Sequence, residues 1–119
     1  MGSRKPEGAL VQGTLDMLIL SRLALGPAHG FGIAEAVRRI SDDVLRIEEG
    51  SLYPALQRLA KKGWVTAKWG QTEANQRAKF YRLTPEGKKQ LLREESRWNE
   101  LVNAIGRVMK AALAPGTEE

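Results

Sequence analysis

The C-terminal part of the chain carries one helical pattern that is too long for a compact domain of this size. Thr84, Pro85 and Glu86 supply an N-cap residue, a proline at the first helical position and an acid in the first turn. Apolar residues then recur every three or four positions: Leu91, Trp98, Leu101, Val102, Ile105, Val108, Met109 and Ala112. A helix over 84–113 would be about 40 Å long, longer than such a domain is wide. Its far end is therefore expected to need a partner.

Two shorter helical patterns open the chain. The first covers residues 10–25 and ends at the Gly26-Pro27 pair. The second follows His29-Gly30 and ends near Ser41. His29 is the single histidine and the chain has no cysteine, so we expect no metal site, and His29 is interpreted as a residue that starts the second helix.

A third amphipathic helix follows. Its apolar stripe is formed by Leu52, Leu56 and Leu59, and it stops at Gly63. Proline has no N–H and fits a first helical turn, so Pro54 places the start of this helix near residues 50 and 51. Ser51 is the predicted N-cap.

Two strands are predicted after the third helix, over 64–69 and 78–83, because both runs are rich in aromatic and β-branched residues. The polar segment 70–77 is typical of an exposed hairpin tip, and Trp64 and Trp69 are interpreted as core and hairpin-base residues. Three helices followed by a hairpin is the element order of a winged helix-turn-helix. The predicted fold is mainly α with a small β-hairpin, followed by the long C-terminal helix.

Positive charge is concentrated in the segment that holds the third helix and the hairpin. Residues 57–82 contain seven basic side chains and one acid, while the whole chain has a formal net charge of +5. A basic surface on these two elements favours a polyanionic partner, double-stranded DNA. The plainer alternative is a solvated surface with chance clustering.

Other functional classes have less support. The chain has no cysteine nucleophile, histidine pair or glycine-rich phosphate loop, so neither an enzyme nor a cofactor is predicted. A winged-helix module that docks an acidic protein without any operator remains the alternative. No stretch is long and apolar enough for a membrane span, and the N-terminus lacks the hydrophobic core of a signal peptide, so a cytoplasmic protein is expected.

Three segments are together more specific than any one of them: GTLDMLILSRLALGPAHGFGI from residue 13, EEGSLYPALQRLAKKGWV from residue 48 and RAKFYRLTPEGKKQL from residue 77. In this order and spacing the chain resembles the PadR family of bacterial transcriptional regulators over about residues 10–101. The resemblance implies a repressor whose single C-terminal helix forms a homodimer. It also implies a two-fold-related operator.

Eight residues are candidates for DNA contacts. The third helix offers Ser51, Tyr53, Gln57, Arg58 and Lys61 on the side opposite its leucines, and the hairpin offers Gln76, Arg77 and Lys79. Gln57 suits an adenine edge and Arg58 a guanine edge, whereas the others suit phosphates or the minor groove. The alternatives are that Tyr53 belongs to the core and that Lys61 and Arg77 are solvated surface charges.

The long helix offers the predicted homodimer interface, formed by Leu91, Trp98, Leu101, Val102 and Ile105. Trp98 falls where some short PadR-like regulators place a tryptophan that faces its dimer mate, so the resemblance implies a pair of indoles that could stack a flat aromatic effector. The alternative is a plain dimer-core tryptophan with no ligand. The predicted organisation is a flexible N-terminus over 1–9, a winged-helix domain over 10–83, a dimerisation helix over 84–113 and a flexible tail over 114–119.

Overall fold

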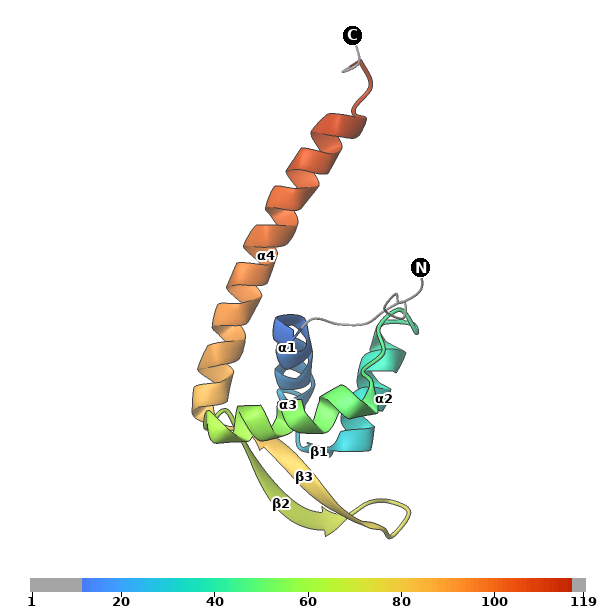
Figure 1. The fold of residues 1–119 in the computed structure, drawn as a ribbon, viewed down its shortest axis with the longest axis vertical. Coiled ribbons are helices and arrows are strands. Elements are labelled where there is room, and N and C mark those ends of the chain that lie inside the picture. The colour runs from blue at the N-terminus through green and yellow to red at the C-terminus, as the bar shows by residue number, and fades with distance from the viewer. Residues whose placement is uncertain (1–11, 117–119) are drawn as a thin grey trace.

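The computed structural model describes residues 12–116. The expected flexible N-terminus, the start of the first predicted helix and the end of the tail lie outside these residues. The elements along the chain are α1 (Gln12–Leu23), β1 (Ala28–His29), α2 (Gly30–Ile40), α3 (Glu49–Lys61), β2 (Val65–Gln71), β3 (Arg77–Leu83) and α4 (Pro85–Leu113). This order confirms the predicted fold class, a winged helix with a long C-terminal helix (Figure 1).

The core lies where the first three helices meet the base of the hairpin. Its largest fully buried side chains are Ile19, Leu20, Ile33, Leu56, Leu59 and Val65. They come from α1, α2, α3 and β2, so each amphipathic helix buries its apolar stripe against the others. This packing fixes α3 across the end of α1 and leaves its opposite side free (Figure 1).

A short strand that the sequence did not predict completes the sheet. β1 pairs antiparallel with β3, with Ala28 opposite Tyr81, and the strand order is β1-β3-β2. Two residues are too few to produce a periodic pattern, which explains why sequence analysis missed this strand.

The hairpin strands are longer than predicted, so the turn shrinks to residues 72–76. The Thr72 hydroxyl oxygen accepts hydrogen bonds from the N–H groups of Ala74 and Gln76, each at 3.2 Å. Asn75 has a left-handed φ of 64°, a conformation that asparagine tolerates well. We call β2, this turn and β3 the wing.

His29 begins the second helix, as predicted. Its Nδ1 accepts a hydrogen bond from the N–H of Gly32 at 3.2 Å and so caps α2. The ring also meets Phe80 edge to face, with centroids 5.2 Å apart. The imidazole therefore ties the start of α2 to the wing strand β3.

The third helix begins earlier than predicted. α3 starts at Glu49 with Glu48 as its N-cap, so the predicted capping role of Ser51 is wrong. The carbonyl oxygen of Glu48 accepts a hydrogen bond from the N–H of Ser51 at 2.9 Å, which places Ser51 inside the first turn. Pro54 then lies in the second turn, not the first, and because it has no N–H it cannot donate to the carbonyl of Gly50.

The long helix begins as the sequence predicts. The Thr84 hydroxyl oxygen accepts a hydrogen bond from the N–H of Gly87 at 3.0 Å, and the hydroxyl donates to the carbonyl of Gly63 at 2.7 Å. The radius of gyration is 17.5 Å, against about 13.5 Å for a compact chain of this length. The difference comes from α4, whose C-terminal part projects beyond the domain (Figure 1).

Candidate nucleic-acid interface

The exposed side of α3 carries four of its five candidate residues. Ser51, Tyr53, Gln57 and Lys61 are exposed, while Leu52, Leu56 and Leu59 are buried on the opposite side. The helix therefore presents short polar, amide, aromatic and cationic groups outward from a rigid core. Such groups can reach both base edges and phosphates.

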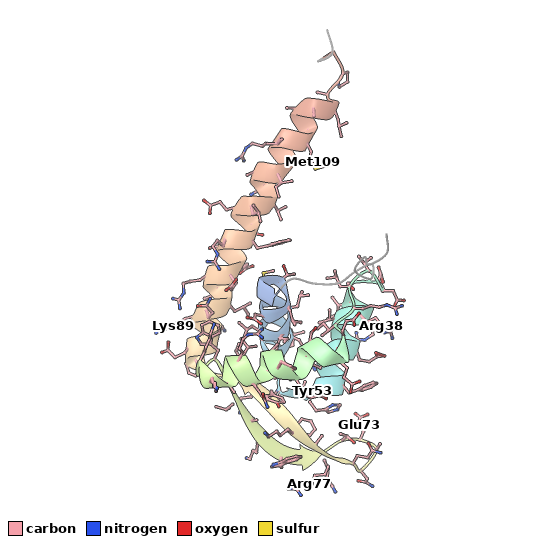
Figure 2. The ribbon with its side chains drawn as sticks, in the orientation of Figure 1. Arg38, Tyr53, Glu73, Arg77, Lys89 and Met109 are labelled. Carbon is pink, nitrogen blue, oxygen red and sulfur yellow. The ribbon has the colours of Figure 1, made fainter. Side chains whose placement is uncertain are left out.

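Tyr53 is positioned by contact with the start of α2. Its ring lies against Gly30 so closely that a Cβ at that position would collide with it. The side chain is nevertheless 43% exposed, and it lies on the side of α3 that faces the wing (Figure 2). Burial raises the pKa of the neighbouring Tyr81 hydroxyl, and the charge of Tyr53 acts in the same direction. Tyr53 is thus neither a core residue nor a free surface group.

Arg58 differs from its expected placement. Its Nη2 lies 2.6 Å from Oδ1 of Asp16 in α1, so the guanidinium is turned toward the protein and not toward a groove. The two side chains are 31% and 13% exposed, and the Nε of Arg58 is buried with no hydrogen-bond partner among residues 12–116. The ion pair joins α3 to α1, and Gln57 is left as the α3 side chain best placed to read a base edge.

Asp16→Asn should show how much this ion pair contributes to the free energy of unfolding. The substitution leaves the partly buried guanidinium without its counter-charge, and we expect the free energy of unfolding to fall by about 2 kcal/mol. Urea unfolding at fixed protein concentration measures it. Glu73→Gln, in the exposed wing turn, is the control and should change stability by less than about 0.5 kcal/mol. Equal stability of Asp16→Asn and the parent would contradict a stabilising role for the pair.

The wing carries its three candidates on the surface. Gln76 lies in the turn, and Arg77 and Lys79 lie on β3; all three are exposed. The guanidinium carbon of Arg77 sits 4.5 Å from the centroid of the Trp69 ring, and the Lys79 ammonium sits 5.8 Å from it. The predicted position of Trp69 at the hairpin base is wrong, because the side chain is 56% exposed and lies opposite Lys79, well along β2.

An open groove separates α3 and the start of α2 from the wing. Its volume is about 1130 Å³. The side chains along it include Phe31, Tyr53, Gln57, Trp69, Arg77 and Lys79. Five of the eight candidate residues line this groove, namely Tyr53, Gln57, Gln76, Arg77 and Lys79, whereas Ser51, Arg58 and Lys61 do not. The groove lies at the end of the molecule away from the tip of α4 (Figures 1 and 2).

The charges on α3 and the wing are unbalanced. Six cations between residues 61 and 82 are exposed, and none makes an ion pair within residues 12–116: Lys61, Lys62, Lys68, Arg77, Lys79 and Arg82. By contrast, Arg38 of α2 makes ion pairs with Glu35 at 2.8 Å and with Asp43, just after the helix, at 2.6 Å. The hydrogen bond from Arg38 lowers the pKa of Glu35. Uncompensated positive charge thus gathers on α3 and the wing.

The predicted interface residues of α4 divide into two groups. Leu91 packs against the core of its own domain, so its contact is within the chain. Trp98, Leu101, Val102 and Ile105 are between 43% and 51% exposed. Farther along, Val108, Met109 and Leu113 are still more exposed, so an apolar stripe runs along the projecting part of the helix. Figure 2 shows Met109 on this part.

A second groove, of about 550 Å³, lies between α4 and α1. It is lined by Met17 and Thr14 of α1 and by Trp98, Leu101 and Ala104 of α4, with Glu94, Arg97 and Glu100 at its edge. Trp98 therefore borders a space large enough for a small molecule.

Over residues 12–116 no helix has the length and apolar character of a membrane span. The same residues contain no group of three or more histidine, cysteine, aspartate or glutamate side chains placed to hold a metal ion.

Comparison with known proteins identifies relatives of the whole fold. Residues 19–93 match the family model described as "Transcriptional regulator PadR-like family". A transcriptional regulator from Clostridium thermocellum is 33% identical with a TM-score of 0.73, over 81% of this chain and 93% of that one. A PadR family transcriptional regulator from Eggerthella lenta is 32% identical with a TM-score of 0.68, over 83% of this chain and 84% of that one.

A curated sequence relative is similar to this chain over nearly its whole length. The uncharacterized protein X of Lysinibacillus sphaericus is 29% identical over 101 residues, which are 85% of this chain and 93% of that protein. The family match covers α3, the wing and the start of α4, which hold every candidate DNA-contacting residue. The chain belongs to the PadR-like family of transcriptional regulators, and this membership implies DNA binding.

Proposed function

We propose that the chain acts in the cytoplasm as a homodimeric repressor that binds a palindromic operator. The observation that carries this proposal is the positive charge of α3 and the wing: Arg77 and Lys79 line the groove beside α3, Lys61 is exposed on that helix, and none of the three makes an ion pair within residues 12–116. A single protomer offers one helix to one major groove. Two protomers related by a two-fold axis would place their α3 helices in half-sites about 34 Å apart.

The proposed dimer is supported by the unpartnered stripe of α4. Trp98, Leu101, Val102, Ile105 and Val108 follow spacings of three and four residues, the pattern that packs helices side by side. Each is at least 43% exposed in the single chain. Covering these side chains with a second copy would remove a large apolar surface from water.

Each candidate residue has a proposed role on the operator. Gln57 reads an adenine edge through its amide, while Ser51, Tyr53 and Lys61 hold phosphates beside it. On the wing, Gln76, Arg77 and Lys79 contact the flanking backbone or minor groove. Arg58 could read a guanine only if its guanidinium left Asp16 and bound the base instead.

A flat aromatic effector is the proposed regulator. The support is the position of Trp98 beside the groove between α1 and α4, because two such indoles brought together by dimerisation could stack an aromatic ring between them. The same α1 carries Asp16, which holds Arg58 of α3. A ligand that displaces α1 would thus alter the spacing of the two α3 helices and release the operator.

Fluorescence anisotropy tests the proposed function. The purified protein is titrated against the duplex upstream of its own gene and against a scrambled duplex, between about 50 and 200 mM salt. We expect the native duplex to bind at least about a thousandfold more tightly near physiological salt. If both bind equally, operators are first enriched from genomic fragments. Failure to enrich any sequence would contradict a specific regulator and favour the protein-interaction module.

Gln57→Ala and Lys79→Ala should weaken DNA binding in different ways. Gln57→Ala removes a base contact, so affinity for the operator should fall about tenfold while scrambled DNA is little affected. Lys79→Ala removes a phosphate contact, so both duplexes should lose affinity alike and the salt dependence should become shallower. Anisotropy titrations at several salt concentrations measure both. Identical losses on the two duplexes for both variants would contradict the assigned roles.

A further inference from the structure

Trp69 is the large aromatic side chain of the wing surface that the roles assigned above leave unused. It is 56% exposed, and both nearby cations of β3 approach its ring, Arg77 at 4.5 Å and Lys79 at 5.8 Å. Exposing an indole to water is unfavourable. Folding alone therefore does not explain why this ring is exposed beside two cations.

The strand register places these residues on one surface of the wing. Trp69 is opposite Lys79, and Gln71 is opposite Arg77. Side chains alternate between the two faces of a strand, so these four share a face. Two residues nearer the base, the same face carries Tyr81, which is buried in the core. The face of the sheet that packs on the core therefore extends along the wing. There it forms one wall of the groove, opposite Tyr53 and Gln57.

We propose that Trp69 is a positioning residue of the DNA interface, whose indole holds the Arg77 guanidinium in place to meet the phosphate backbone. This inference rests on the proposed function. A free arginine on an exposed strand samples many rotamers and loses that freedom when it binds a phosphate. An indole face restricts the guanidinium in advance through a cation–π contact, so less entropy is lost on binding.

The position of Arg77 makes this restraint useful. Arg77 is the first residue of β3, directly after the turn, where a long side chain has few neighbours to hold it. At this position the guanidinium of Arg77 lies over the ring of Trp69. Lys79 lies farther from the ring and directly across from Trp69, so it gains less from the contact.

Trp69→Leu is the first test. Leucine keeps an apolar side chain on the exposed strand but removes the ring face. We expect affinity for both the operator and a scrambled duplex to fall about fivefold, whereas the slope of affinity against salt stays unchanged because every cation remains. Trp69→Phe keeps a ring face and should recover most of the lost affinity. Leu25→Ala changes an exposed apolar residue two positions after the end of α1; this variant is the control and should bind as the parent does.

A double-mutant cycle separates positioning from a direct effect. Arg77→Gln removes the charge and should reduce the salt slope. In the Arg77→Gln background, Trp69→Leu should cost less than about twofold, because the group that it positions is gone. Thermal unfolding of each variant by circular dichroism checks that the fold is intact, and we expect midpoints within about 2 °C of the parent for these exposed sites.

The outcomes separate this inference from the function on which it rests. Binding by the parent protein with unchanged affinity of Trp69→Leu would overturn the inference alone. So would a fivefold loss that persists in the Arg77→Gln background, since the indole would then act without the arginine. Absence of DNA binding by the parent protein would overturn the proposed function and this inference together.

Discussion

Replacing Leu101 and Ile105 by glutamate should convert the protein to a monomer and lower operator affinity by at least about a hundredfold. Both side chains lie on the exposed apolar stripe of α4, and four carboxylates buried between two helices would repel each other and lose their hydration. A monomer then contacts a single half-site and loses the advantage of two linked contacts. Sedimentation velocity measures the mass, and anisotropy measures the affinity.

Asn99→Glu with Asn103→Glu is the matched control for the stripe. These exposed residues lie on the same helix with the same spacing, but each directly follows a stripe residue, Trp98 or Val102, and is turned about 100° away from it around the helix axis. The control adds the same charge and should remain dimeric with near-normal affinity. A stripe variant that stays dimeric, or a monomer that binds the operator as tightly as the parent, would contradict the dimer proposal.

Gly87→Ala should have the largest effect on stability, lowering the free energy of unfolding by about 3 kcal/mol or more. A Cβ at Gly87 would collide with the carbonyl oxygen of Trp64 and crowd the side chain of Leu83. That carbonyl cannot easily move, because it also accepts a hydrogen bond from the N–H of Thr84 at 3.0 Å. The contact holds the first turn of α4 against the base of the wing. Urea unfolding measures the loss.

Gly106→Ala is the control for Gly87→Ala. Gly106 lies in the same helix, and apart from the adjoining helix backbone no atom of residues 12–116 lies within 4 Å of its added Cβ. Alanine there should raise helix propensity and stabilise the protein by about 0.5 to 1 kcal/mol. Equal effects of the two substitutions would show that helix propensity and not the contact with Trp64 governs stability at Gly87.

Much of the fold could be predicted because periodic apolar patterns reflect how helices and strands bury their faces. The stripe of α3 and the start of α4 at Thr84 both follow from local rules that act over one or two helical turns. The start of α3 was misjudged because Ser51 has the chemistry of a cap, yet the helix begins at Glu49 with only a backbone contact from Glu48.

The candidate site could be predicted only in part. A helical period shows which side chains share a face, and it correctly put Tyr53 and Gln57 on the exposed side of α3. It cannot show that Arg58 finds Asp16, because 42 residues separate the two and their approach depends on how α1 packs on α3. The contact of Trp69 with Arg77 was missed for a related reason, since it depends on the register of the wing strands.

Hydroxyl-radical footprinting of the operator is the measurement that tests the central claim most directly. A dimer whose two α3 helices occupy successive major grooves should protect two equivalent windows whose centres are about 10 base pairs apart, with outer protection where the wings meet the backbone. Lys79→Ala should weaken the outer protection alone. A single protected window, or equal protection of a scrambled duplex, would contradict a two-fold-symmetric, sequence-specific regulator.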